Sequence, residues 1–231
     1  MTRPTTRLAP PRPDLRIGDQ WTYRIEDRLR RAQFEERRRV VAIDAETFTC
    51  EQQSDAPGYA SGRWIYTREW NLLSRPALAA PGDTEEDAGR WVWTPAFPLF
   101  RFPLVKGDRE AGEARVANAV TGTSNLHRYE REVLGRFLLR APSESLRPSL
   151  APTGAQPSSG LPTRKIAVWR VRYVARVEVE GSDPPLAWVN EEHYDYAPSV
   201  NAVYAMTHRV TGPDGAITRD ASSVLVRHSR G

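Results

Sequence analysis

Residues 165–210 constrain the fold most, because apolar side chains recur there at every second position. The run Trp169-Arg170-Val171-Arg172-Tyr173 shows the pattern: odd positions are apolar and even positions are charged. A period of two places these two sets on opposite faces of a β-sheet. Turn-forming residues follow at 181–185 and at 197–199. The stretch therefore predicts three consecutive antiparallel strands with one apolar face and one charged face.

Similar alternation recurs along the rest of the chain. Further strands are expected at residues 20–25, 33–43, 46–52, 64–70, 113–121, 125–139 and 216–227. Within residues 26–36, the apolar positions are too sparse for a helical stripe, so we expect a hairpin tip around Arg28–Ala32 and not a helix. We therefore expect a mainly β protein, built as a curved antiparallel sheet or half-barrel of meander hairpins with little helix.

Proline-rich segments divide this pattern. Residues 1–14 predict a disordered leader, and residues 141–164 predict a flexible Pro/Ser-rich insertion in a single β-rich domain spanning 15–229. A faint echo between Leu15-Arg16-Ile17-Gly18-Asp19 and Leu104-Val105-Lys106-Gly107-Asp108 suggests possible halves, 15–102 and 103–229.

Two other proline-containing segments interrupt the strands. We expect residues 74–89 to form a long surface loop. Residues 91–104 are the most apolar stretch, but their three prolines make them an edge segment or an extended cover packed across a sheet.

Composition excludes several classes of protein. The chain is 27% charged and contains no apolar run near the roughly 20 residues of a membrane-spanning helix, so we expect no transmembrane segment. The net charge of +4 does not establish a partner. Cys50 is the single cysteine, which excludes an internal disulfide and a multi-cysteine metal site. The first residues lack the apolar core of a signal peptide, which indicates a cytoplasmic protein if Met1 is the true start.

Motifs for catalysis are weak. Glu191, His193 and Asp195 would share one strand face, but same-face neighbours lie roughly 7 Å apart, too far to converge on one metal ion. Nothing around Cys50 would activate its thiol. We therefore expect no catalytic residues, no metal and no cofactor. A metal-dependent hydrolase remains a minor alternative, centred on His193 or His208.

Nucleic-acid binding is also disfavoured. The arginines between residues 28 and 39 are interleaved with acidic residues that would repel phosphate. Cross-strand pairing on a solvated hairpin explains the same residues.

The feature with a functional interpretation is a set of aromatic residues. Aromatic side chains on a concave sheet face can line a pocket for a lipid or another apolar ligand, although they more often fill a core. The candidate ligand-binding residues are Trp21, Tyr23, Trp64, Tyr66, Trp70, Trp169, Tyr173 and Trp188.

Three short motifs carry a resemblance to a known family. They are Gly18-Asp19-Gln20-Trp21-Thr22-Tyr23, Pro98-Leu99-Phe100-Arg101-Phe102-Pro103-Leu104 and Tyr194-Asp195-Tyr196-Ala197-Pro198. Across most of 15–229, the chain resembles uncharacterised proteobacterial envelope proteins whose β domains look similar to the lipoprotein carriers LolA and LolB. The resemblance implies an exported protein of the periplasm or cell envelope, with a curved sheet that often encloses an apolar cavity, and implies no catalytic residues. The lack of an export signal and the 141–164 insertion depart from that pattern.

Together these features predict a non-enzymatic, envelope-associated binding or scaffold domain. Its partner would be a lipid, another apolar molecule or an envelope protein. The alternative is a structural protein–protein interaction module without a ligand pocket, for which a solidly filled interior would speak.

Overall fold

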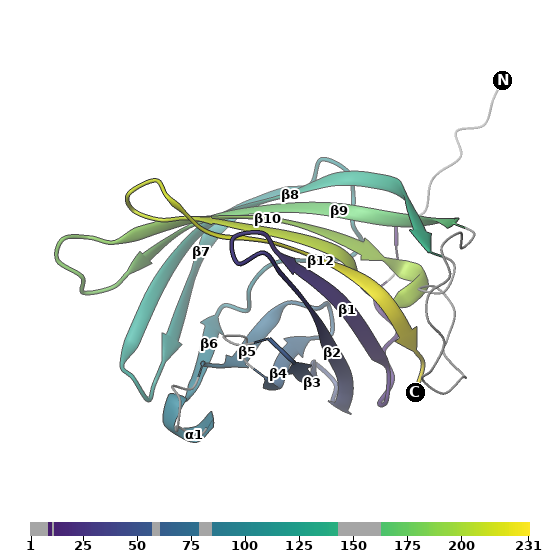
Figure 1. Ribbon diagram of the computed structural model, residues 1–231, viewed down its shortest axis with the longest axis horizontal. Coiled ribbons are helices and arrows are strands. Elements are labelled where there is room, and N and C mark those ends of the chain that lie inside the picture. Colours follow the sequence, from purple (N-terminus) through teal and green to yellow (C-terminus); the bar gives the residue numbers. More distant parts are fainter. Residues whose placement is uncertain (1–8, 11, 57–60, 79–84, 143–162) are drawn as a thin grey trace.

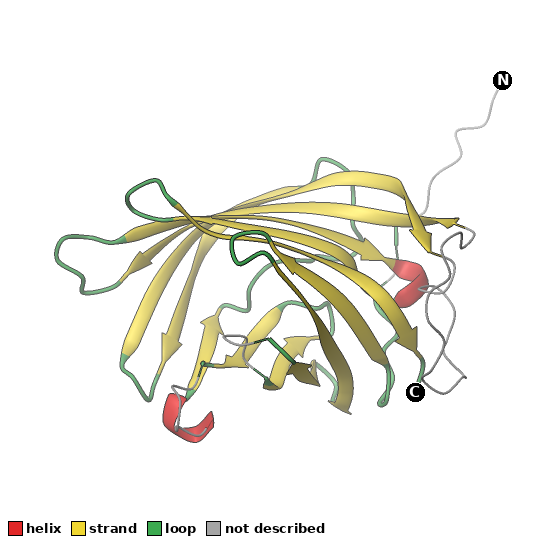
Figure 2. Cartoon of the chain, in the orientation of Figure 1, coloured by secondary structure: helices red, strands yellow, loops and turns green. Residues whose placement is uncertain are grey.

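The alternating segments fold into one closed antiparallel β-barrel of twelve strands (Figures 1 and 2). The computed structural model describes residues 9–10, 12–56, 61–78, 85–142 and 163–231. Most of the predicted leader and residues 143–162 of the predicted insertion lie outside the described residues, and the two ends of that predicted insertion belong to β8 and β9. Each strand pairs with the next one along the chain, and β1 pairs with β12. Among the described residues, no helix is long and apolar enough to cross a lipid bilayer.

The elements run in chain order. They are β1 (Gln20–Asp27), β2 (Ala32–Ile43), β3 (Thr47–Ser54), β4 (Gly62–Thr67), β5 (Leu72–Pro76), α1 (Glu85–Ala88), β6 (Arg90–Thr94), β7 (Arg109–Asn118), β8 (Thr123–Pro142), β9 (Thr163–Val179), β10 (Ala187–Ala197), the 3₁₀ turn η2 (Pro198–Val200), β11 (Ala202–Thr211) and β12 (Ile217–Ser229).

The prediction of a mainly antiparallel β protein is confirmed, but the expectation of a curved sheet or half-barrel is wrong. Backbone pairing between β1 and β12 runs from Gln20 opposite Ser229 to Asp27 opposite Ala221, which closes the sheet. Alternation in the sequence determines which face of a strand is buried. It carries no information on whether the first and last strands meet.

The meander predicted at 165–210 corresponds to β9, β10 and β11. Val171, Tyr173 and Ala175 of β9 are fully buried inside the barrel. The intervening outward-facing residues form cross-strand ion pairs, such as Arg170 with Asp195 at 2.7 Å. Cross-strand pairs of opposite charge suit a hydrated sheet surface.

One end of the lumen is filled by the connection between β6 and β7, residues 95–108. Phe97 donates its backbone N–H to Leu72 of β5, and its ring lies 4.3 Å from the ring of Tyr173 on β9. The side chain of Asn71 hydrogen-bonds both backbone groups of Phe100. The connection therefore bridges distant walls of the barrel from inside. The edge or cover position expected for residues 91–104 is wrong for residues 91–94, which lie in β6 and pair with both β5 and β7.

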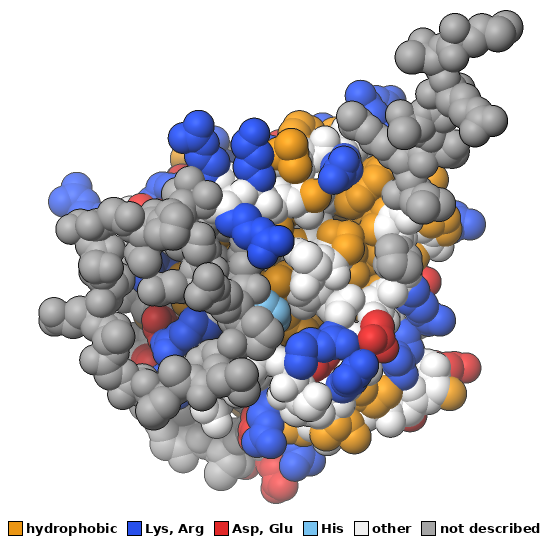
Figure 3. Space-filling model, turned by 90° about the vertical axis from the view of Figure 1, so that its right-hand side faces the viewer, with side chains coloured by type: hydrophobic (Ala, Val, Ile, Leu, Met, Phe, Trp, Pro, Cys, Tyr) orange, Lys and Arg blue, Asp and Glu red, His pale blue; other side chains and the backbone are white. Residues whose placement is uncertain are grey.

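This plugged end also carries η2 and the C-terminus, which is marked at the right of Figure 1. Figure 3 views this end from outside and shows apolar side chains there with Lys and Arg side chains around them. Among the described residues, the exposed apolar side chains near this end are Ile17, Val105, Phe137 and Leu138.

The expectation that residues 74–89 form a long surface loop is wrong in part. Strand β5 extends through Pro76, and the helix α1 lies directly before β6. Residues 79–84 lie outside the described part of the chain. A five-residue strand is too short to show a clear alternation, and Pro76 at its end resembles a loop signal.

Trp21 is expected to be critical for stability. Its indole N–H donates to the carbonyl of Val200 at 2.9 Å, its ring lies 5.2 Å from that of Trp70, and it is 1% exposed. Trp21→Ala should lower the free energy of unfolding by about 3–5 kcal/mol, measured by urea denaturation with far-UV circular dichroism. The matched control Trp188→Ala should cost far less, because Trp188 is only partly buried. Equal losses in the two variants would contradict the assignment of Trp21 to the core.

Candidate functional site

The lumen of the barrel has two chemically different halves. In the plug half, next to residues 95–108 and η2, the large hydrophobic core cluster fills the interior. In the hairpin half, next to the hairpins β1–β2, β7–β8, β9–β10 and β11–β12, charged and aromatic side chains face inward. Strand register shows this, because residues directly opposite each other on paired strands point to the same face. The inward-facing residues there include Trp64, Arg75, Trp93, His127, Tyr173, Trp188, Glu192, His208 and Arg219.

The eight aromatic residues proposed from the sequence are divided between these halves. Trp21, Tyr23, Tyr66 and Trp70 lie in the plug half and are buried. The ring of Trp70 lies 4.8 Å from that of Phe48 and 5.3 Å from that of Tyr66. Such contact distances are those of packed aromatic pairs. These residues form a filled core.

The remaining four candidates lie on β4, β9 and β10. Trp169 and Tyr173 are buried, and Tyr173 stacks on Tyr129 with ring centroids 5.6 Å apart. Trp64 and Trp188 are only partly buried although they point inward. Partial exposure of inward-facing indoles indicates that solvent reaches the hairpin half of the lumen.

The guanidinium of Arg75 lies near the indole rings of Trp64 and Trp93. Its guanidinium carbon is 5.6 Å from the ring centroid of Trp64 and 5.8 Å from that of Trp93. A guanidinium over an indole face is attracted by the negative potential of the ring. Burial, and then the nearby charge of Arg219, lower the pKa of Arg75. The side chain is therefore a cation that the fold holds inside the barrel.

A carboxylate and a histidine face Arg75 from the opposite wall. Glu192 accepts a hydrogen bond from the hydroxyl of Tyr194, and its carboxylate lies 3.4 Å from Nε2 of His208. Burial lowers the pKa of His208 and the charge of Glu192 opposes that effect, while Arg219 and Arg75 lower the pKa further. The group is thus an inward-facing electrostatic network contributed by β5, β10, β11 and β12.

Several buried polar groups in this half lack an internal partner. Within the described part of the chain, no hydrogen bond is made by Nε1 of Trp64, Nε1 of Trp93 or the hydroxyl of Tyr173. Both indole groups can only donate. A buried donor without an acceptor is costly, and each instance in a folded protein requires an explanation. The hairpin half is therefore rich in donors.

In a second buried network, the charged groups are paired. Glu36 accepts hydrogen bonds from Arg38 at 2.7 Å and from Gln52 at 2.9 Å, and the guanidinium of Arg38 lies 4.9 Å from the ring centroid of Tyr23. The charge of Arg38 is thus compensated by a carboxylate inside the barrel. This arrangement contrasts with that of Arg75.

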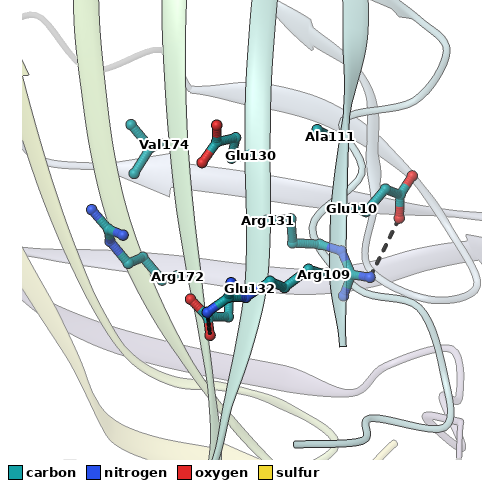
Figure 4. Close-up of a pocket in the computed structure, with 8 residues that line it drawn as sticks. All are labelled: Arg109, Glu110, Ala111, Glu130, Arg131, Glu132, Arg172 and Val174. Atoms are coloured by element: carbon teal, nitrogen blue, oxygen red, sulfur yellow. Dashed lines mark hydrogen bonds and ion pairs between the residues drawn. The ribbon is translucent and has the colours of Figure 1, made fainter. Parts of the chain in front are cut away.

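The outer face of β7, β8 and β9 carries a groove of about 360 Å³ (Figure 4). Its lining residues are Arg109, Glu110, Ala111, Glu130, Arg131, Glu132, Arg172 and Val174. Arg109 pairs with Glu132 at 2.8 Å, and Arg172 pairs with Glu191 at 3.2 Å. Because these charges already compensate one another, the groove offers a weaker site than the lumen does.

The residues considered for metal binding or nucleophilic chemistry take structural positions. Glu191 and Asp195 of β10 face outward and pair with Arg172 and Arg170. Cys50 is buried, and burial raises the pKa of its thiol to about 12. A thiol with such a pKa is a poor nucleophile near neutral pH.

Sequence reasoning missed Arg75, Trp93 and Glu192 as site residues, and it named His208 only as a centre of the minor metal-hydrolase alternative. Arg75 lies in the segment that was interpreted as a surface loop. Glu192 could have been found, since it alternates with Trp188 and Tyr194 and must share their face. Its pairing with His208 depends on the register of β10 and β11, which the sequence does not provide.

His127 makes stability depend on pH. Burial, reinforced by the charge of Arg75, lowers its pKa to about 4. The unfolded chain binds this proton near pH 6.5, so stability is full above that pH and falls as pH decreases toward 4. Between pH 7 and pH 4.5, the wild type should lose about 2–3 kcal/mol more than His127→Gln, as measured by urea denaturation. Parallel pH profiles of the two proteins would contradict this placement of His127.

Comparison with known proteins gives a fold relationship. No family model and no curated protein matches this sequence. A crystal structure of an inferred exported protein with a YmcC-like fold from Bacteroides fragilis is 12% identical, with a TM-score of 0.50, and the match covers 96% of this chain and 100% of that chain. An inferred lipoprotein from Parabacteroides distasonis is 10% identical, with a TM-score of 0.49 and coverage of 93% and 96%.

At 12% identity, the first match concerns the fold alone. The chain therefore shares the YmcC-like fold of the Bacteroides fragilis protein. The resemblance to LolA and LolB, and to proteobacterial envelope proteins, stays a prediction.

Proposed function

We propose that the protein is a non-enzymatic binding domain of the cell envelope, and that it takes a small amphipathic molecule into the hairpin half of its lumen. The observation that carries the proposal is the pair of partly buried, inward-facing indoles of Trp64 and Trp188, next to buried donors without internal partners. Ligand sites in proteins commonly combine apolar and aromatic walls with a few convergent polar groups. A lipid or another partly apolar ligand fits such a lining.

The envelope location is supported by the shared fold. The Bacteroides fragilis protein with this fold is described as exported. The proposed absence of catalysis is supported by the positions of Cys50 and of the outward-facing residues of β10, which are buried or ion-paired.

A structural interaction module is the second candidate. The densely packed plug half favours it, because a filled interior leaves no room for a ligand there. The two candidates differ in whether the hairpin half binds a small molecule.

Fluorescence titration with phenylnaphthylamine, an uncharged apolar probe, tests the proposal. The probe should bind saturably, and Trp188→Ala should weaken binding about tenfold, the effect of losing roughly 1.4 kcal/mol of contact free energy. Phe137→Ala removes an aromatic side chain from the outer surface and should leave the affinity unchanged. Absence of saturable binding by the folded wild type would contradict the proposed function and favour the interaction module.

A further inference from the structure

We infer that the ligand of the hairpin half carries an anionic group, a carboxylate, phosphate or sulfonate, and that Arg75 is the residue that binds it. This inference rests on the proposed function and specifies the chemistry of the same site. The rings of Trp64 and Trp93 both lie within cation–π distance of the guanidinium.

The first argument is the lack of a carboxylate partner for Arg75. Throughout the described ranges, the guanidinium of Arg75 forms no hydrogen bond and no ion pair, and it lies near the indole rings of Trp64 and Trp93. Other arginines of the barrel are paired: Arg38 with Glu36 at 2.7 Å, and Arg170 with Asp195 at 2.7 Å. A partly buried guanidinium leaves its directional donors unused unless an acceptor reaches it, and its planar fork fits carboxylate and phosphate groups.

The second argument is the charge around Arg75. Arg219 lies near enough to disfavour the charged form of Arg75, and Arg75 has the same effect on His127 and His208. Glu192 is the carboxylate that acts on Arg75, but it already interacts with Tyr194 and His208. Arg75 and Arg219 therefore place two guanidinium charges near each other in this part of the lumen. Two neighbouring cations attract an anionic group, and the attraction is stronger beside a low-dielectric wall.

The third argument is the pair of indole donors next to Arg75. The indole N–H groups of Trp64 and Trp93 have no acceptor among the described residues, and these two rings are the ones that lie near Arg75. An anionic group supplies several acceptor atoms and no donor. It would therefore complement both the charge and the hydrogen-bonding capacity of the site, whereas a cationic group would meet neither.

Two fluorescent probes of nearly the same shape separate this inference from the proposed function. Anilinonaphthalene sulfonate carries a sulfonate that phenylnaphthylamine lacks. The wild type should bind the sulfonate at least about tenfold more tightly, equivalent to roughly 1.4 kcal/mol. Arg75→Met should abolish that preference while changing the affinity for the neutral probe less than about twofold. Retained neutral-probe binding shows that the variant is folded.

Two further variants control for nonspecific electrostatic attraction of the sulfonate probe to the protein. Arg109→Met removes an exposed arginine that pairs with Glu132 on the outer face, and it should leave both affinities unchanged. Arg75→Lys retains the charge without the planar fork and should keep part of the preference.

The outcomes are distinguishable. Equal affinity of the wild type for the two probes would overturn the anion inference and leave the proposed function standing. A sulfonate preference that survives Arg75→Met would overturn the assignment to Arg75. If neither probe binds saturably, both the inference and the proposed function fail. If Arg75→Met does not fold, the comparison of the two probes on the wild type still decides whether the site prefers an anion.

Discussion

The backbone pairing of β1 with β12 is the constraint on which the rest of the structure depends. It converts a meander with two free edges into a closed wall, so inward-facing side chains of distant strands enclose one interior. Asp19, which directly precedes β1, reinforces the closure: its carboxylate accepts the backbone N–H groups of Arg16 and Gly231 at 2.9 and 3.0 Å.

Within this wall, different segments of the chain line the two halves of the lumen. The connection of residues 95–108 brings Phe100 against Tyr196, with ring centroids 5.6 Å apart, and Trp70 donates its indole N–H to the carbonyl of Asn201. These contacts fill one half. In the other half, Arg75 and the partly buried tryptophans face inward beside a smaller apolar cluster around Tyr129 and Tyr173, which Phe97 of the connection contacts. The same barrel therefore provides both a stable core and a polar, aromatic interior surface.

The strands were predictable to the extent that alternation is local. The pattern around Val171 predicts β9 and its buried face, because one strand contains the whole signal. Closure and the position of Trp70, whose φ of 66° places it in a turn, depend on contacts far apart in sequence. The candidate site was less predictable, since an isolated arginine beside Pro76 resembles a loop residue. Only the strand register brings Arg75 opposite Trp91 and His208 opposite Glu192.

The central claim, a barrel filled at one half and solvent-accessible at the other, is tested most directly by thiol labelling of the folded protein. Asn190→Cys places a thiol on the inner face of the hairpin half, opposite Ala175, where the native residue is partly exposed. Cys50 is a buried internal reference in the same chain. A small maleimide should modify the introduced cysteine rapidly and Cys50 only after unfolding. Equal protection of both thiols would show that the lumen is filled throughout, and equal reactivity would show that the plug does not seal it.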